Sequence, residues 1–380
     1  ESDVYSNDNF KDGLKFIFFS LATLELARKL DWSPNIIHAN DWHTAITAFQ
    51  LNRLRSSDLF FKNTKSVITI HNLPFMGSGT DKALDEFGIP PSDTEQLPTW
   101  ARKLPLPMGL AAADQLVTVS PTYAKEILTP EFGSGLEDFL STQKNKLCGI
   151  INGLEESLWN PEDDADISMN FSTQNLSPRR ENKLALIDEF SLNPDPEIPL
   201  LIFIGRMSRQ KGVDIALNAL QMIKNEPWQA IFLGTGDIDL ENLTLKMQDR
   251  FPEHFRAIIK FDALLAKRMY AGADILLMPS RYEPCGLAQM IAMLYGCVPV
   301  ASSTGGLRDT IKNTLDDFMG SGFLFKDLST KGLAESIQHA FSFFGKKDKW
   351  VDIQINGMNN DFSWRKSALE YAKIYQRLLR

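Results

Sequence analysis

Short apolar runs that show no polar alternation constrain this chain more than any other feature. They are rich in Ile, Val and Leu, and segments with helical periodicity separate them. The runs occupy 35–39, 66–70, 115–120 and 147–151, and then 199–205, 229–234, 257–261, 274–279 and 297–302. Strands that are apolar on both faces are typical of parallel sheets covered by helices on both sides. The pattern therefore predicts an α/β fold built from βαβ units.

The stretch 160–198 interrupts this alternation. It is rich in Asp, Asn and Pro, which indicates an exposed connection around one short helix. At 380 residues the chain is too long for one ordinary core. We predict two Rossmann-like parallel-sheet domains that face a cleft, in 1–150 and 151–355, and an amphipathic helix in 356–380.

The composition excludes several classes of partner. A net charge of −8 and a pI near 5.3 argue against nucleic acid or an anionic membrane. The sequence contains no run of about 18 apolar residues, so no membrane-spanning helix is predicted. No secretory signal is evident. The three cysteines, Cys148, Cys285 and Cys297, show no metal-ligand spacing, so we expect a reducing compartment, packing thiols and no metal.

Ligands of parallel sheets bind beyond the carboxyl ends of the strands, so the residues that follow each apolar run are the candidates for a site. His43 lies in the segment NDWHTA after the first run, and Asn72 lies in HNLPFMG after the second. The alternative for His43 is a surface histidine behind a capping Asp41. Two such motifs at neighbouring strand ends favour function.

The segment GRMSRQKG follows the run 199–205. Arg206 and Lys211 lie between Gly205 and Gly212, at the start of a predicted helix. Helix N-termini already favour anions, so the added cations predict a phosphate site. The competing interpretation is a solvated charge run, which the flanking glycines and the strand-end position disfavour.

Three further loops follow strands. RYEPCGL places Glu283 directly after the run 274–279. LGTGD (233–237) and STGGLRD (303–309) could contact phosphates through backbone N–H groups or could be plain turns, and the sequence leaves both open.

Taken together, the motifs resemble the bacterial glycogen synthase and plant starch synthase family. They occur in the family's order over nearly the whole chain: YSNDNFKDGLKF, HANDWHTA, VITIHNLPFMG, ADQLVTVSPTYAKEI, INGLEESLWNP, GRMSRQKG, LGTGD, PSRYEPCGLAQ, STGGLRDT and DFSWRKSALEYAKIY. The resemblance implies a GT-B fold without a cofactor. It also implies transfer of glucose from ADP-glucose, or a related nucleotide sugar, to the non-reducing end of an α-1,4-glucan with retention of configuration.

The resemblance also implies roles for individual residues. His43 would meet the transferred sugar, Arg206 and Lys211 the diphosphate, and Glu283 the sugar near the developing oxocarbenium. The implied substrate-binding residues are Asn72, Asn152, Gly205, Phe261, Cys285, Gly286, Leu287, Thr304, Gly305 and Gly306. Among these, Phe261 would stack against the base, and the last helix of the chain would cross back to the first domain.

The sequence departs from the family at its start. The Lys-Thr-Gly-Gly-Leu loop that members carry near the N-terminus is absent, because the only TGGL lies at 304–307. This predicts an incomplete first domain, completed by an upstream segment or by self-association, and a chain that binds nucleotide but transfers glucose poorly alone.

Two alternatives remain open from sequence. One is a retaining glycosyltransferase with a small acceptor, although the second Glu of many such enzymes is Ile291 here. The other is a truncated, non-catalytic copy that binds glucan or a partner synthase. The expected compartment is the bacterial cytoplasm, with the plastid stroma as the alternative.

Overall fold

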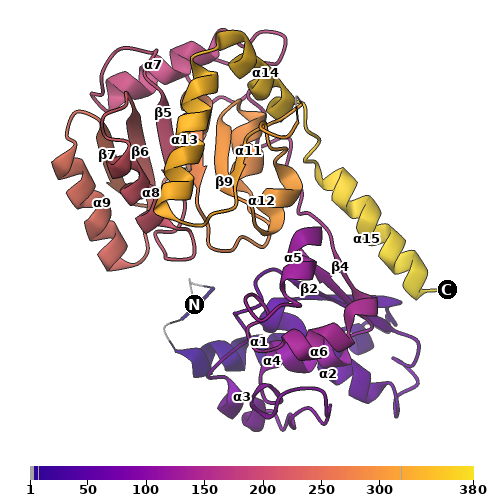
Figure 1. The fold of residues 1–380 in the computed structure, drawn as a ribbon. Coiled ribbons are helices and arrows are strands. Elements are labelled where there is room, and N and C mark those ends of the chain that lie inside the picture. Colours follow the sequence, from indigo (N-terminus) through magenta and orange to yellow (C-terminus); the bar gives the residue numbers. More distant parts are fainter. Residues whose placement is uncertain (1–3, 7, 318) are drawn as a thin grey trace. The chain divides into compact units, whose positions relative to one another are not determined.

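The computed structural model describes residues 4–6, 8–317 and 319–380, so Asn7 of the motif YSNDNFKDGLKF lies outside the described residues. The chain forms two compact units (Figure 1). The first comprises Glu1–Ile151 and Ser367–Arg380, and the second comprises Asn152–Lys366.

The first unit is built on a parallel four-stranded sheet in the order β1-β2-β3-β4. Its strands are β1 (Ile36–Asn40), β2 (Lys65–Ile70), β3 (Gln115–Thr118) and β4 (Leu147–Gly149). Its helices are α1 (Asn9–Lys29), α2 (Asp41–Leu54), α3 (Asp81–Glu86), α4 (Pro105–Ala112), α5 (Pro121–Glu126) and α6 (Glu137–Thr142), with 3-10 turns at Thr99–Ala101 and Lys144–Lys146. Helix α4 lies so close to α2 that a Cβ at Gly109 would be 2.6 Å from the Ala45 carbonyl oxygen, so glycine is required there.

The second unit contains a parallel six-stranded sheet in the order β10-β9-β8-β5-β6-β7. Its strands are β5 (Leu200–Ile204), β6 (Gln229–Gly234), β7 (Phe255–Ile259), β8 (Ile275–Met278), β9 (Val298–Ser302) and β10 (Phe323–Phe325). Its helices are α7 (Arg179–Glu189), α8 (Val213–Met222), α9 (Ile238–Arg250), α10 (Ala263–Gly272), α11 (Ala288–Leu294), α12 (Gly305–Thr310), α13 (Thr330–Phe344) and α14 (Lys347–Met358).

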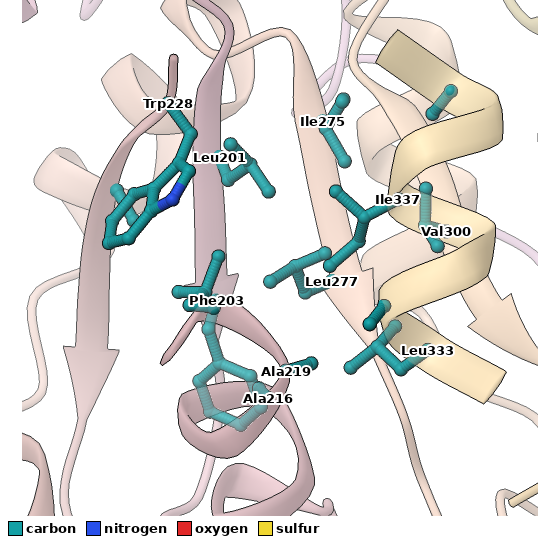
Figure 2. Packing of buried hydrophobic residues seen from close by; sticks show 14 of the residues in the cluster. Leu201, Phe203, Ala216, Ala219, Trp228, Ile275, Leu277, Val300, Leu333 and Ile337 are labelled. Carbon is teal, nitrogen blue, oxygen red and sulfur yellow. The ribbon is translucent and has the colours of Figure 1, made fainter. Parts of the chain in front are cut away.

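The core of the second unit explains why its strands lack alternation. Figure 2 shows Leu201 and Phe203 of β5 beside Leu277 of β8, covered by Leu333 and Ile337 of α13. All five are almost completely buried. Each such side chain contributes about 1.5–3 kcal/mol relative to exposure to water.

The strand order reverses between β5 and β8. Strands β6 and β7 continue from one side of this pair, and β9 and β10 from the other. Loops that leave the two strands at their carboxyl ends diverge at such a switch point, where a ligand can enter.

The predicted runs correspond to β1 to β9, and the short helix predicted in 160–198 is α7. Strand β10 was not predicted. The predicted domain end at residue 355 is wrong for this structure because it cuts α14. Trp350 and Ile353 of that helix are buried in the core of the second unit, which continues to Lys366.

Helix α15 (Trp364–Leu378) is the predicted amphipathic C-terminal helix, and it runs from the second unit into the first. Its Ile374 packs with Val67, Val117 and Ile150 of the first unit. Among the helices of the described residues, none combines the length and the apolar character needed to cross a membrane.

Candidate functional site

The switch point of the second sheet brings together two of the predicted loops. Arg206 and Lys211 follow β5, and Glu283 follows β8, its neighbour in the sheet. Parallel strands end at the same edge, so residues 72 positions apart in sequence meet at this point.

Lys211 and Glu283 form an ion pair at this edge. The Lys211 Nζ donates to Glu283 Oε2 over 2.6 Å, and the Ser280 hydroxyl donates to the same oxygen over 3.0 Å. Glu283 is 5% exposed, whereas the Lys211 side chain retains 27% of its exposure. The carboxylate is therefore fixed, and the ammonium, with three N–H donors, still reaches solvent. Ser280 was missed from sequence, although its position directly after the run 274–279 could have indicated it.

Gly212 and Arg281 hold the β5 and β8 loops together. Gly212 has φ +70°, and a Cβ there would be 2.0 Å from the Pro279 carbonyl oxygen, so only glycine fits. The Arg281 guanidinium donates to both oxygens of Asp214 over 2.9 and 2.8 Å. This bidentate pairing lowers the pKa of the Asp214 carboxyl.

Arg206 and Gly205 face open space beside this pair. The Arg206 side chain is exposed and has no hydrogen-bond or ion-pair partner in the described part of the chain. A Cβ at Gly205 would have no heavy atom within 4 Å. The arrangement leaves a guanidinium and a backbone segment accessible at the end of β5.

The loop after β9 closes on the same cluster. The Gly306 N–H donates to the Glu283 carbonyl oxygen over 3.0 Å. Cβ atoms at Gly305 and Gly306 would each lie 2.0 Å from a carbonyl oxygen, that of Glu283 and that of Cys285 respectively. The two glycines and the buried Thr304 therefore belong to the Lys211–Glu283 cluster.

Cys285 is a buried thiol under this loop. Burial raises its pKa to about 12, and the backbone N–H of Asn152, which donates to the sulfur, opposes the rise. The thiol is therefore protonated at neutral pH and is not poised for nucleophilic attack. Gly286 follows at φ +73°, and Leu287, which is 45% exposed, precedes α11.

Gln289 of α11 stabilises the turn at Cys285 and Gly286 through hydrogen bonds. Its side-chain amide donates to the carbonyl oxygens of Cys285 and Gly286 and to the Thr310 hydroxyl. Gln289 was not predicted as a site residue, because no spacing pattern distinguishes it from a surface glutamine.

The LGTGD loop acts mainly as a close-packed turn. A Cβ at Gly234 would be 1.9 Å from the Gly205 carbonyl oxygen, and one at Gly236 would be 2.3 Å from that of Met207. The Thr235 hydroxyl and the Gly236 N–H both donate to the Glu241 carboxylate, over 2.6 and 2.8 Å. These contacts account for the glycines without a ligand.

Phe261 lies apart from the Lys211–Glu283 cluster. It follows β7, which β6 separates from β5, and its side chain is 87% exposed. An aromatic ring with so little packing does not stabilise the fold, so it is free to contact a ligand.

His43 and Asn72 belong to the first unit. His43 lies in the first turn of α2 and hydrogen-bonds the Tyr5 hydroxyl at 3.1 Å. Its ring meets Phe16 edge to face and lies tilted against Trp42, with ring-centroid distances of 4.7 and 4.4 Å. Desolvation lowers the pKa of His43. Its imidazole is therefore neutral at pH 7.

Asp41 joins the β1 and β2 loops rather than capping α2. It adopts φ +51° and accepts the His71 backbone N–H over 2.7 Å. Burial raises the pKa of the Asp41 carboxyl, although His71 opposes the rise. The buried Oδ1 of Asn72 has no hydrogen-bond partner among the described residues, so an acceptor atom is available beside His71.

Within residues 4–6, 8–317 and 319–380, no group of three or more His, Cys, Asp or Glu side chains could hold a metal ion.

Family models match both units. A model described as the starch synthase catalytic domain matches residues 1–142, and one described as glycosyl transferases group 1 matches residues 198–342.

Curated relatives and solved structures resemble the chain over almost its full length. A glycogen synthase of Thermodesulfovibrio yellowstonii is 39% identical over 96% of this chain and 73% of its own. One of Thermotoga petrophila is 41% identical over 99% of this chain and 78% of its own. The catalytic domain of starch synthase IV from Arabidopsis thaliana, solved with ADP and acarbose, superposes with a TM-score of 0.89 at 31% identity, covering 99% of this chain and 78% of that one. A sucrose-phosphate synthase from Thermosynechococcus elongatus shares the fold, with a TM-score of 0.62 at 21% identity over 95% of this chain and 77% of its own.

Proposed function

The chain belongs to the glycogen and starch synthase family, and from this premise we propose that it moves glucose from ADP-glucose to the non-reducing end of an α-1,4-glucan with retention of configuration. The family and the GT-B fold predicted from sequence are confirmed, and the chain is a glycosyltransferase. Its relatives assign it to glucosyl transfer onto a glucan. The donor, the stereochemistry and the residue roles are the proposal.

The Lys211–Glu283 pair at the switch point is the observation that carries the proposal. When the bond between the glucose C1 and the diphosphate oxygen breaks, negative charge develops on the diphosphate. Lys211 and the exposed Arg206 are the cations of the β5 loop that would stabilise this charge. Lys211, which its bond to Glu283 already orients, acts without reorganisation in the transition state.

Glu283 would serve the other half of the separated charge. Its carboxylate is buried and bonded by Lys211 and Ser280, so its position is defined before substrate binds. A fixed carboxylate near C1 favours the positive oxocarbenium character of the sugar ring. Retention then requires that the acceptor hydroxyl attacks from the face that the diphosphate leaves, and that its proton passes to the departing phosphate oxygen.

Adenine as the base is supported by starch synthase IV, which was solved with ADP. In this proposal the exposed ring of Phe261 stacks against the base. Backbone groups of Gly205, Thr304, Gly305 and Gly306 would border the phosphates, and those of Gly286 and Leu287 the sugar. Asn152, which holds the Cys285 sulfur through its backbone N–H, would position this loop.

His43 and Asn72 would contact hydroxyl groups of the sugar. A neutral imidazole can donate one hydrogen bond and accept another, which suits sugar hydroxyls. The unpartnered Oδ1 of Asn72 would accept from a hydroxyl.

The test compares initial rates with ADP-glucose and UDP-glucose at equal concentrations, using glycogen, maltotriose and free glucose as acceptors. We expect ADP-glucose to be preferred by at least about tenfold, which corresponds to about 1.4 kcal/mol. Proton NMR of the elongated product should show an α-1,4 linkage. A β linkage would exclude retention, faster turnover of UDP-glucose would exclude the adenine donor, and preference for free glucose would favour the small-acceptor alternative.

A further inference from the structure

The second unit carries a cavity at the edge of its sheet opposite the Lys211–Glu283 cluster. Its lining includes Glu197, which precedes β5, and Asp274, which precedes β8, so it lies at the amino ends of the strands. The cavity has a volume of about 510 Å³, and its lining residues include the start of α7, the end of α13 and the start of α14. This volume is within the range of small-molecule sites.

The cavity is positively charged although the protein is acidic. Arg179, Arg180, Lys183 and Lys347 line it, against the carboxylates of Glu197 and Asp274 alone among its lining residues. The charge of the lining therefore favours an anion over a neutral or cationic ligand.

The two buried cations, Lys183 and Arg179, are already hydrogen-bonded within the protein. Lys183 donates to the carbonyl oxygens of Pro196 and Ile198 over 2.6 and 2.8 Å and to Asp274 Oδ2 over 2.6 Å. Arg179 donates to the carbonyl oxygens of Tyr295 and Ala273. They set the potential of the cavity but leave little donor capacity for a ligand.

The two outer cations remain accessible. The Arg180 side chain is exposed and has no hydrogen-bond or ion-pair partner among the described residues. It also lies in the first turn of α7, where the helix dipole disfavours a cation. Lys347 is 56% exposed and pairs with Glu197 over 2.5 Å. An anion at this rim would relieve the unfavourable position of Arg180 and compete with Glu197 for Lys347.

Aromatic rings form the wall behind these cations. Trp350 and Phe344 pack edge to face, with ring centroids 5.3 Å apart. Trp350 is 4% exposed, and its buried indole N–H has no hydrogen-bond partner in the described residues. The indole nitrogen is closed off from the cavity by protein atoms, and only the edges of the two rings, with Phe344 8% exposed, can border it.

We propose that this cavity is a second binding site, for a small organic phosphate or carboxylate whose anionic oxygens meet Arg180 and Lys347 and whose ring lies along the edges of Phe344 and Trp350 that border the cavity. The shared chemistry is an anionic group attached to a ring. This proposal does not depend on the reaction at the opposite edge of the sheet.

The test is calorimetric titration of the full chain with phenyl phosphate, a hexose 6-phosphate, inorganic phosphate and phenol. We expect at least one of the two ring phosphates to bind at least about tenfold more tightly than inorganic phosphate or phenol, because only it satisfies both the cations and the aromatic wall. The comparison of phenyl phosphate with the hexose phosphate then distinguishes an aromatic ligand from a sugar. Absence of binding by both ring phosphates at 10 mM would overturn the proposal, as would equal binding of inorganic phosphate.

Substitutions locate the bound probe. Arg180→Ala should weaken binding about fivefold, and Lys347→Ala about threefold. Glu197→Gln should strengthen binding about threefold, because it removes a repelling carboxylate and releases Lys347. Arg250→Ala, an exposed arginine on α9 outside the cavity lining, is the charge-matched control and should change nothing.

Two results would contradict this location. If Arg206→Ala abolishes binding while Arg180→Ala does not, the probe occupies the carboxyl edge of the sheet. If Glu197→Gln weakens binding as much as Arg180→Ala does, the rim charges do not act as proposed.

Discussion

Lys211 and Arg206 carry the same charge in the same loop, but their surroundings differ. Lys211 is bonded to the buried Glu283, whereas Arg206 is exposed and has no partner in the described chain. If both stabilise the departing diphosphate, each loss should lower kcat by about 10²–10³, the effect typical of one preorganised donor. The free energy of unfolding should distinguish the Lys211 variant from the Arg206 variant.

We predict that Lys211→Met lowers the free energy of unfolding by about 1–3 kcal/mol, because it leaves a buried carboxylate without its cation. Arg206→Ala should stay within about 0.5 kcal/mol of the parent chain. Urea unfolding and turnover of ADP-glucose, measured on the same preparations, check this. The double variant Lys211→Met with Glu283→Gln should regain stability but not rate. An Arg206→Ala enzyme with near-normal turnover would contradict the diphosphate role.

The sequence predicted where individual site residues lie in the fold better than it predicted which side chains they contact. The ends of β5 and β8 follow from apolar runs, so Arg206, Lys211 and Glu283 could be assigned to one edge of the sheet. Which side chains fix Glu283 could not be deduced. Ser280 and Lys211 meet it only because β5 and β8 are neighbours, and strand order is a property of the whole sheet.

Helix α15 shows how an element is held by polar groups distant in sequence. His38 of β1 bonds the Tyr375 hydroxyl through Nδ1 at 2.6 Å and the Thr69 hydroxyl through Nε2 at 2.7 Å. Ser367 of the same helix donates to the Ile151 carbonyl oxygen over 2.5 Å. The two partners of the first bond are 337 residues apart, which is why sequence predicted an amphipathic helix but not this network.

The burial of His38 predicts a pH dependence of stability. Desolvation, aided by the charge of His71, lowers the pKa of His38 from 6.5 to about 4. The unfolded chain therefore takes up this proton first as the pH falls. Stability is fully present above pH 6.5 and is lost between about 6.5 and 4, by up to about 3 kcal/mol.

The measurement is the difference in melting temperature between the parent chain and His38→Gln from pH 7.5 to 4.5. We expect the advantage of the parent to shrink as the pH falls, since glutamine can keep hydrogen bonds but does not titrate. Tyr375→Phe, which removes one bond and retains the histidine, should preserve the pH dependence. Parallel curves for the parent and His38→Gln would show that His38 does not cause it.

Strand β10 and the boundary at α14 mark the limit of prediction for elements. Phe323–Phe325 is only three residues long and follows a glycine turn, so the run is too short to distinguish from a loop. The predicted boundary at 355 failed because α14 reads as a surface helix in sequence. Only its packing through Trp350 and Ile353 assigns it to the second unit.

For the molecule as a whole, charge poses the central problem. A chain of net charge −8 repels a nucleoside diphosphate at long range, so any attraction must come from local cations. Arg206 and Lys211 supply it at one edge of the second sheet. Glu283, the nearest carboxylate, already accepts from Lys211 and Ser280, and it is a poor candidate to hold Mg²⁺.

We therefore predict that ADP binds this chain in EDTA with an affinity within about threefold of that in Mg²⁺. A metal ion would neutralise the phosphates that Arg206 and Lys211 recognise, so it should weaken rather than strengthen binding.

Raising the ionic strength from 0.05 to 0.5 M should lower the affinity for ADP several-fold, because exposed cations are screened over shorter distances. Arg206→Ala should reduce this salt dependence, and Arg250→Ala should not. Calorimetry gives the dissociation constant of ADP for each chain at each condition. If binding disappears in EDTA and returns with Mg²⁺, the two cations are insufficient, and carboxylates of this acidic chain must recruit the metal that binds the diphosphate.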